Sequence, residues 1–344
     1  MARIITGLDI GSTNIRAAVC SMDAKGRLTI LALDNMPSNG IDSGNIVNFD
    51  VACNDLIGII RKLEKQIKRK IRYISATISG SGMAGLETSG MVGLSKRPRQ
   101  IWQRDVDKCV KTAEMVKIPE DRQIVQKAIH SFYINEGDLV DNPIGMYATK
   151  LGIKMYLVTA EIAKIKNLYK CVEHTGYILD NVVFSESAIA ESILTDENRE
   201  GMTALIDIGS HLTSIALFKH KSLKYINCLP KGMKDPDVID EPVTLLRQLK
   251  ESIKNMDLAR IIVTGGGALK ENVLEDAEKS FGITCELGRV KLDWCSLNPS
   301  DAVIHTSSLG VVSYEAKRLL SRTKLKNPLR RTMGFVNNLL ENYF

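Results

Sequence analysis

Two stretches of this chain share one pattern of apolar and polar positions. Each has an apolar run, the triplet Asp-Ile-Gly and a second apolar run, at residues 7–19 and 204–218. Apolar runs on both sides of a glycine turn predict a β-hairpin, because glycine supplies the backbone freedom that the tip needs. One carboxylate lies at each tip, Asp9 in the first stretch and Asp207 in the second. The repeat therefore predicts two similar α/β lobes whose hairpin tips face each other.

A glycine run supplies a third element of the same kind. Residues 263–272 read Val-Thr-Gly-Gly-Gly-Ala-Leu-Lys-Glu-Asn, which predicts the end of a strand and a helix that opens at about Ala268. Backbone amides of all three elements would hold phosphate oxygens, and Asp9 and Asp207 would hold a magnesium ion through its waters. A single such hairpin or glycine run is more often only a turn or loop, but the three together predict a polyphosphate site.

The composition is typical of a compact protein of about two domain lengths. The chain has 344 residues, of which 44% are hydrophobic, enough for a core in each lobe. No window approaches the ~20 uninterrupted apolar residues of a membrane span, and the first strand begins so early that we expect no signal peptide. Seven scattered cysteines without a Cys-x-x-Cys pair favour a reducing cytoplasm over a disulfide framework or a zinc site.

The net charge of +6 comes partly from one basic segment, residues 61–72. This segment continues a helix predicted to begin near Asn54, and its apolar positions share one face, so the charges are expected on the solvated face. No aromatic residues are interleaved to stack on bases, and no nucleic-acid-binding motif is present. We therefore expect no nucleic-acid partner.

The order and spacing of the three elements resemble the actin, Hsp70 and hexokinase superfamily of nucleotide-binding proteins. In that superfamily the two hairpins are the phosphate-1 and phosphate-2 elements, and the glycine run is the adenosine element. Glu186 matches a glutamate at the start of its first connecting helix, where Ser187 replaces the usual proline. The resemblance implies an actin-like ATPase fold with ATP and Mg as cofactors. The residues that it implies for their binding are Asp9, Gly11, Ser12, Thr13, Asn14, Glu186, Asp207, Gly209, Ser210, Gly265, Gly266 and Gly267.

Residues 84–158 predict a module inserted into the first lobe. Its expected elements are a strand at 86–94, a helix at 105–116, a strand at 124–134 and, after a turn at 142–143, a strand at 147–158. Here the chain resembles the FtsA family of bacterial cell-division proteins. The segments that carry this resemblance are 40–50, 105–119, 141–146 and 167–176. In that family such an insertion serves contacts between subunits and with other division proteins.

The FtsA resemblance covers the first 218 residues and resumes at Ile261. Between these stretches, residues 233–240 lead almost directly into a helix expected at 241–255. The family's second-lobe helical subdomain, which receives the tail of FtsZ and closes over the adenine, is therefore nearly absent. For this reason the family's FtsZ site is not assigned to any residue here.

The second hairpin departs from the superfamily pattern. Residues 209–214 read Gly-Ser-His-Leu-Thr-Ser where the superfamily favours Gly-Gly-Gly-Thr-Thr-Asp. His211 and Leu212 add side chains where the backbone approaches phosphate, and Ser214 replaces a carboxylate. Two alternatives follow, either weak nucleotide binding with negligible hydrolysis or a hairpin retained without its ligand.

The last segment predicts a membrane-targeting helix. A basic, flexible linker is expected at 321–327, followed by a helix at 328–344 with proline in its first turn. The residues expected at the membrane are Leu329, Arg330, Arg331, Met333, Val336, Leu340, Tyr343 and Phe344. The apolar members share one face, and the basic ones suit an anionic surface, as in the C-terminal targeting helix of FtsA. The alternative is a terminal helix docked on the protein's own core.

These features predict a cytoplasmic scaffold on the inner face of the membrane. It would self-associate, tether the FtsZ ring or bind another division protein, and recruit further division proteins. The expected parts are a first lobe at 1–83 and 159–200 completed by about 308–320, an insert at 84–158, a second lobe at 201–307, and a linker with targeting helix at 321–344.

Two other functions remain open from the sequence. One is a scaffold of pilus assembly similar to PilM, which has a similar fold. The other is an ATP-hydrolysing actin-fold enzyme or sugar kinase. That enzyme would need an intact phosphate-2 carboxylate and a catalytic aspartate in a substrate-binding insert, and neither is visible.

Overall fold

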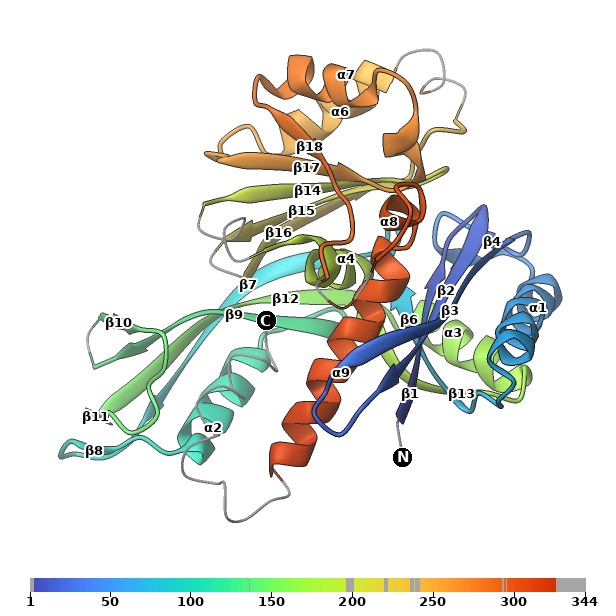
Figure 1. The fold of residues 1–344 in the computed structure, drawn as a ribbon. Helices are drawn as coiled ribbons and strands as arrows, with labels where there is room; N and C mark the ends of the chain where they lie inside the picture. Colours follow the sequence, from blue (N-terminus) through green and yellow to red (C-terminus); the bar gives the residue numbers. More distant parts are fainter. Residues whose placement is uncertain are drawn as a thin grey trace.

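The computed structural model describes residues 3–135, 137–195, 201–219, 222–235, 238, 242–292, 294 and 296–325. Two lobes and an inserted domain make up this part of the chain (Figure 1). The first lobe has a five-stranded sheet in the order β13-β6-β1-β2-β3. Its strands are β1 (Arg3–Ile10), β2 (Asn14–Met22), β3 (Leu28–Pro37), β6 (Tyr73–Ile78) and β13 (Ile178–Phe184). The first three strands are antiparallel, and β6 and β13 run parallel to β1.

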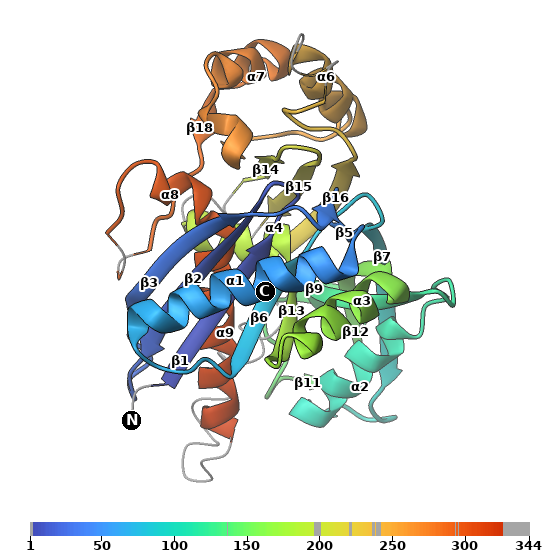
Figure 2. The same cartoon turned by 90° about the vertical axis from the view of Figure 1, so that its right-hand side faces the viewer.

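Helices cover both faces of this sheet, because successive strand residues point to opposite faces. The helices α1 (Phe49–Ile67) and α3 (Ile162–His174) pack on one face, and α9 (Thr306–Leu325) packs on the other (Figure 2). Leu8 and Val19 contribute to the core under α1, whereas Ile5 and Ala18 pack against α9.

The helix α1 shows how local sequence defines an element. The Asn48 side chain accepts a hydrogen bond from the Val51 backbone N–H and caps the first turn, and Lys68 ends the helix in a left-handed conformation. Buried side chains then recur at helical spacing, among them Leu56, Ile60 and Leu63. Because of this cap the helix begins five residues before the start expected near Asn54.

The second lobe repeats the sheet of the first. Its strand order is β16-β15-β14-β17-β18, with the same antiparallel and parallel pairs. The strands are β14 (Thr203–Ile208), β15 (Thr213–Lys219), β16 (Ser222–Leu229), β17 (Arg260–Thr264) and β18 (Cys285–Leu287). The helices α6 (Pro242–Ser252) and α7 (Val273–Phe281) pack on one face, and α4 (Ser185–Ile193) contributes to the core on the other. The prediction of two similar lobes is confirmed.

The inserted domain contains the predicted strand, helix, strand and strand. Its sheet has the order β10-β9-β12-β7, and a short pair, β8 with β11, lies beside it. The elements are β7 (Ala84–Gly93), β8 (Arg99–Gln100), α2 (Gln103–Glu114), β9 (Arg122–Ile134), β10 (Asp138–Val140), β11 (Tyr147–Ala148) and β12 (Lys150–Glu161). The helix α2 begins two residues before its expected start, because the Asp105 carboxylate accepts from the Trp102 backbone N–H at 2.9 Å.

The insert also packs against the second lobe along strand β16. The Ser222 hydroxyl donates to the Ile129 carbonyl at 2.8 Å, and the Ile226 backbone N–H donates to the Tyr156 hydroxyl at 3.2 Å. The His130 ring forms a third hydrogen bond, to the Leu223 carbonyl at 2.8 Å. The insert therefore belongs to the first lobe in sequence but contacts both lobes in space.

The remaining elements are short. These are β4 (Ile41–Asp42), β5 (Asn45–Ile46), a 3-10 helix at Gly266–Leu269 and α8 (Asp301–Ile304). Close packing of α4 and α9 also joins the lobes, since a Cβ on Gly310 would lie 1.8 Å from the Ala188 carbonyl oxygen. Only residues 230–241 separate β16 from α6, which leaves no room there for a helical subdomain.

The end of the described chain corrects one prediction. Residues 321–325 continue α9, so the expected flexible linker is helical there, because no proline or glycine interrupts the chain between Gly310 and Pro328. Residues 326–344 lie outside the described residues, and with them the predicted targeting helix with Leu329, Arg330, Arg331, Met333, Val336, Leu340, Tyr343 and Phe344. No helix within the described ranges is long and apolar enough to cross a membrane.

Candidate functional site

The two predicted phosphate hairpins have the same turn. The Gly11 backbone N–H donates to the Asn14 carbonyl at 3.1 Å, and the Gly209 N–H donates to the Leu212 carbonyl at 2.9 Å. The tips also meet across the lobes, because the hydroxyls of Thr13 and Ser210 are hydrogen-bonded. The structure thus brings the residues expected at both tips into one place.

The tip carboxylates lie in different surroundings. Asp9 accepts a hydrogen bond from the Thr77 hydroxyl at 3.0 Å, and its other oxygen lies 3.5 Å from Arg16. Asp207 lies against Gly265, where an added Cβ would come 2.2 Å from its Oδ1 atom. Burial, and then the negative charge of Asp9, raise the pKa of Asp207 to about 7, and the positive charge of Arg16 lowers it in part. The charges of Asp9, Asp207 and Arg16 therefore act on one another between the lobes.

Glu186, in the first turn of α4, belongs to the same group. Its side chain is buried, and neither carboxylate oxygen has a hydrogen-bond partner among the described residues. Burial raises the pKa of Glu186 to about 7; the nearby Ser214 hydroxyl lowers it in part, and the charges of Asp207 and Asp9 raise it further. A buried carboxylate without a partner is costly, so it is favoured in the protonated form or beside a ligand.

The glycine run meets the first hairpin through an arginine that sequence reasoning missed. A Cβ on Gly266 would lie 3.5 Å from the Arg16 guanidinium, so Arg16 reaches from β2 to the second lobe. The sequence contained a signal for this contact: in the predicted hairpin Arg16 pairs directly with Asp9, which places its positive charge beside the tip carboxylate. In contrast, Gly267 is buried, and a Cβ there would meet Ile208 and Met233.

The helix predicted to open at about Ala268 was placed too early. Gly265 has a φ of 86° and leads into the 3-10 helix, whereas α7 opens at Val273 after Asn272, whose φ is 65°. These two residues with positive φ interrupt the helical path, so the glycine run forms a tighter turn than expected.

A third hairpin, β4–β5, bridges the two tips. The Ser43 backbone N–H donates to the Ser12 hydroxyl at 2.8 Å, and the Ser43 hydroxyl donates to the His211 carbonyl at 3.2 Å. The His211 ring lies 3.8 Å from Asp42 and 3.9 Å from Asp235. Sequence reasoning used this segment only as a family resemblance, although its Asp-Ser-Gly turn was a local signal for a tight hairpin.

The second tip is covered by a segment of its own lobe. The Met233 backbone N–H donates to the Gly209 carbonyl at 3.0 Å, and the Lys234 N–H donates to the Ser210 carbonyl at 2.8 Å. This contact depends on Gly232, where an added Cβ would come 2.5 Å from the Ser210 backbone. The carbonyls of the second tip are therefore bonded within the lobe.

The described residues of this site are not arranged to bind a metal ion directly. In the part of the chain that the structure describes, no group of three or more His, Cys, Asp or Glu residues is placed to hold a metal ion. Two carboxyl groups with a raised pKa and the unpartnered oxygens of Glu186 fit a site that a cation would complete.

Comparisons with known proteins agree with this architecture. A protein-family profile described as "SHS2 domain inserted in FTSA" matches residues 80–159. Cell division protein FtsA of Neisseria meningitidis serogroup B is 25% identical over 230 residues, which are 67% of this chain and 55% of that protein. The corresponding protein of Pseudomonas aeruginosa is 27% identical over 228 residues, 66% of this chain and 54% of that protein. The chain spans about half the length of the curated relatives it matches.

Solved structures are similar over most of the chain. The PilM-PilN type IV pilus biogenesis complex matches with a TM-score of 0.64 and 12% identity, covering 91% of this chain and 98% of that one. The ethanolamine utilization protein EutJ of Carboxydothermus hydrogenoformans matches with a TM-score of 0.52 and 13% identity, covering 90% and 89%. With the repeated sheets and facing hairpins, these similarities define an actin-like fold.

Within that class the chain is similar in sequence to the bacterial cell-division protein FtsA over about two-thirds of its length, and its inserted domain matches the domain inserted in FtsA.

Proposed function

We propose that this protein is an actin-like scaffold of bacterial cell division that tethers the FtsZ ring to the cytoplasmic face of the membrane and recruits other division proteins. The observations that carry the proposal are the similarity to FtsA over two-thirds of the chain and the match of residues 80–159 to the domain inserted in FtsA. Because the second-lobe subdomain has no counterpart here, the partner is either FtsZ at another surface or a different division protein.

Self-association in this proposal uses the inserted domain. Three large apolar side chains are exposed at the end that carries β8 and β11, namely Trp102, Met146 and Tyr147. Deletion of the whole insert would also uncover β16, so a surface substitution is the cleaner test. Tyr147→Lys should abolish assembly on a lipid monolayer, whereas Met115→Lys, on an exposed residue elsewhere in the insert, should not.

Nucleotide binding in this proposal is weak, and turnover is negligible. The amides of the tips and of Gly265 and Gly266 would hold phosphate, and Asp9 and Asp207 would hold magnesium through water. Three features support weak binding: the tips hydrogen-bond to each other, Ser214 stands where the superfamily has a carboxylate, and Gly232 closes one side of the second tip.

Membrane attachment would come from residues 328–344. Burial of an apolar side chain such as Leu340 would contribute roughly 1.5 to 3 kcal/mol. The basic residues would add on the order of 1 kcal/mol each on anionic lipid. A lattice of self-associated subunits would combine many such weak anchors into one strong attachment.

Liposome flotation tests the attachment. The full chain should float with vesicles that contain phosphatidylglycerol, and a truncation ending at Asn327 should not. Leu340→Glu should release the protein, whereas Asn338→Glu, which adds the same charge on the opposite face of the predicted helix, should release it less. Equal flotation of the full chain and the truncation would show that this segment is not an anchor.

Recruitment of FtsZ is tested in the same assay. FtsZ should float only when the full chain is present, and the truncation should remain bound to FtsZ in solution. Absence of FtsZ from both fractions would count against FtsZ as the partner.

The second candidate is a cytoplasmic scaffold of pilus assembly. The observation that favours it is the fold similarity to the PilM-PilN complex over 98% of that chain. Depletion in the source bacterium separates the two functions, because a division scaffold should give filamentous cells and a pilus scaffold should give normally dividing cells without pili.

A further inference from the structure

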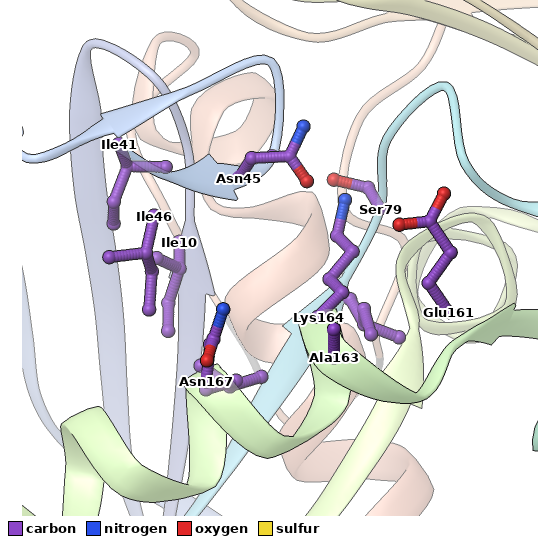
Figure 3. Close-up of a pocket in the computed structure, with 12 residues that line it drawn as sticks. Ile10, Ile41, Asn45, Ile46, Ser79, Glu161, Ala163, Lys164 and Asn167 are labelled. Carbon is purple, nitrogen blue, oxygen red and sulfur yellow. The ribbon is translucent and has the colours of Figure 1, made fainter. Parts of the chain in front are cut away.

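A cavity of about 140 Å³ lies in the first lobe between the β4–β5 hairpin and the first turn of α3 (Figure 3). One wall is apolar and is formed by Ile10, Ile41 and Ile46. The facing wall is formed by the first turns of α3 and by Glu161, the residue before this helix. The polar side chains that line the cavity are Asn45, Ser79, Glu161, Lys164 and Asn167. The cavity is therefore apolar on one side and polar on the other.

Lys164 is the unusual residue of this cavity. Its ammonium group is buried and has no hydrogen-bond partner among the described residues. The group lies against two glycines with positive φ, since an added Cβ would come 2.1 Å from it at Gly80 and 3.1 Å from it at Gly44. Burial lowers the pKa of Lys164 to about 8, although nearby Cys228, Glu161 and Glu186 raise it in part. A buried ammonium without a partner is costly, and an anion in the cavity would relieve that cost.

Other donors face the same space. The cavity is lined by Ala163 and Lys164 in the first turn of α3, where no side chain caps the helix; Glu161 is the N-cap residue, and the Ile162 N–H already donates to the Asp121 carbonyl at 2.8 Å. The N-terminus of a helix attracts an anion through its free N–H groups and its dipole. Asn167 adds a side-chain amide, and in Figure 3 the Lys164 ammonium points toward Ser79 and toward the amide oxygen of Asn45. Among the described lining residues, Glu161 is the one carboxylate, and it is exposed at the rim.

We propose that this cavity binds a carboxylate on a short aliphatic stem. The carboxylate would lie between Lys164, Asn45 and the first turn of α3, and the stem would pack on Ile10 and Ile46. A phosphate dianion suits the cavity less, because the isoleucine wall offers it no donors and Glu161 repels a second negative charge. The ligand is either a free small acid or a carboxylate of a partner's extended segment. Lys164 is not among the residues proposed for nucleotide, although the charge of Glu186, which is among them, acts on it.

Methyl NMR spectroscopy of the full chain tests the proposal, because the isoleucines of the apolar wall report directly on occupancy. Pentanoate should shift the δ1-methyl signals of Ile10, Ile41 and Ile46 saturably, and neutral pentanamide should not. Lys164→Met, which keeps the length of the side chain but removes the charge, should weaken pentanoate binding at least about tenfold, equivalent to about 1.4 kcal/mol. Glu161→Gln should strengthen it, because it removes the carboxylate at the rim.

Two capped peptides separate the sources of the carboxylate. Tighter binding of acetyl-glycyl-leucine with a free C-terminus, or of acetyl-glutamyl-leucine amide, would assign the cavity to a partner's segment. Binding of pentanoate alone would assign it to a free acid.

The proposal is overturned if pentanamide binds as well as pentanoate, if Lys164→Met binds pentanoate unchanged, or if no probe shifts the methyl signals. The second-lobe methyl signals of Ile206 and Ile262 serve as a control for folding of the variants. If Lys164→Met does not fold, Asn167→Leu provides the same test through the loss of one amide donor.

Discussion

The two lobes have the same sheet and the same hairpin turn but different chemistry around the tip carboxylate. In the first lobe, Asp9 has a hydroxyl donor in Thr77 and a positive neighbour in Arg16. In the second, Asp207 lies against Gly265, and its pKa is raised to about 7. The positive charge that acts on both carboxylates is therefore that of Arg16, which belongs to the first lobe.

This difference shows which features of the repeat depend on the backbone. Each turn is closed by a glycine N–H bonded to a carbonyl three residues later, so the hairpin tolerates Ser-Thr-Asn at one tip and Ser-His-Leu at the other. Ligand chemistry depends instead on side chains, and these have diverged. The shape of a phosphate element is therefore retained more easily than its function.

The largest expected effect compares the glycines that follow the equivalent strands β17 and β6. Gly265→Ala should lower the free energy of unfolding by about 4 kcal/mol, because the new Cβ meets Asp207 and the Ile208 carbonyl and φ is 86°. Gly80→Ala should cost about 2 kcal/mol, since φ is 132° and the new Cβ meets mainly the end of the Lys164 side chain, which can shift more readily than backbone. Urea unfolding measures both, and equal losses would show that the two positions are not different in packing.

The second prediction concerns the tip carboxylates and pH. The pKa of Asp207 is raised from 3.8 to about 7, so the folded protein holds a proton that the unfolded chain releases. Stability should therefore fall as pH rises from about 4 to above 7. Asp207→Asn should remove part of this dependence and stabilise the protein at pH 8 by about 2 kcal/mol.

Asp9→Asn is the matched change in the first lobe. It should destabilise the protein by about 1 kcal/mol, because it removes the charge that faces Arg16. Glu186→Gln, between the lobes, should act as Asp207→Asn does. Thermal unfolding measured from pH 5 to pH 8 separates these variants. If Asp207→Asn destabilised the protein at pH 8, the raised pKa of Asp207 would be contradicted.

The third prediction concerns the residual affinity for nucleotide. If the first hairpin carries most of that affinity, Asp9→Ala should weaken Mg-ATP binding about tenfold and Ser214→Ala less than about twofold. Calorimetric titration measures the affinity, and phosphate release measures the turnover. Sub-micromolar binding with sustained phosphate release in the unchanged protein would contradict a degraded second lobe.

The smallest expected effect distinguishes the third residue of each turn. Thr13→Ala removes the hydroxyl bonded to Ser210 and should cost about 1 kcal/mol. His211→Ala removes only long contacts of 3.8 and 3.9 Å with Asp42 and Asp235 and should cost about 0.5 kcal/mol or less. Urea unfolding measures both losses of stability, and the loss for His211→Ala should be the smaller of the two. If His211→Ala lowered the free energy of unfolding more than Thr13→Ala, the His211 ring would be the main contact between the tips.

The sequence by itself determined the elements whose signals are local. Both Asp-Ile-Gly hairpins, the amphipathic α1 and the order of strands and helix in the insert follow from apolar periodicity and turn residues, which act within a few positions of the chain. Boundaries were less accurate where a cap or a left-handed residue decided them, as at Asn48 and Asn272.

Only the tertiary structure decided which of these elements meet. Arg16 of the first lobe reaches Gly266 of the second, and Ser43 hydrogen-bonds to both hairpin tips. The insert packs on β16, and the Lys164 ammonium lies between Gly44 and Gly80. Each contact joins residues that are distant in sequence, and periodicity carries no information about such pairs. The fold class was therefore readable from repeated local patterns, whereas the charges that surround the candidate site depended on how the two lobes and the insert pack together.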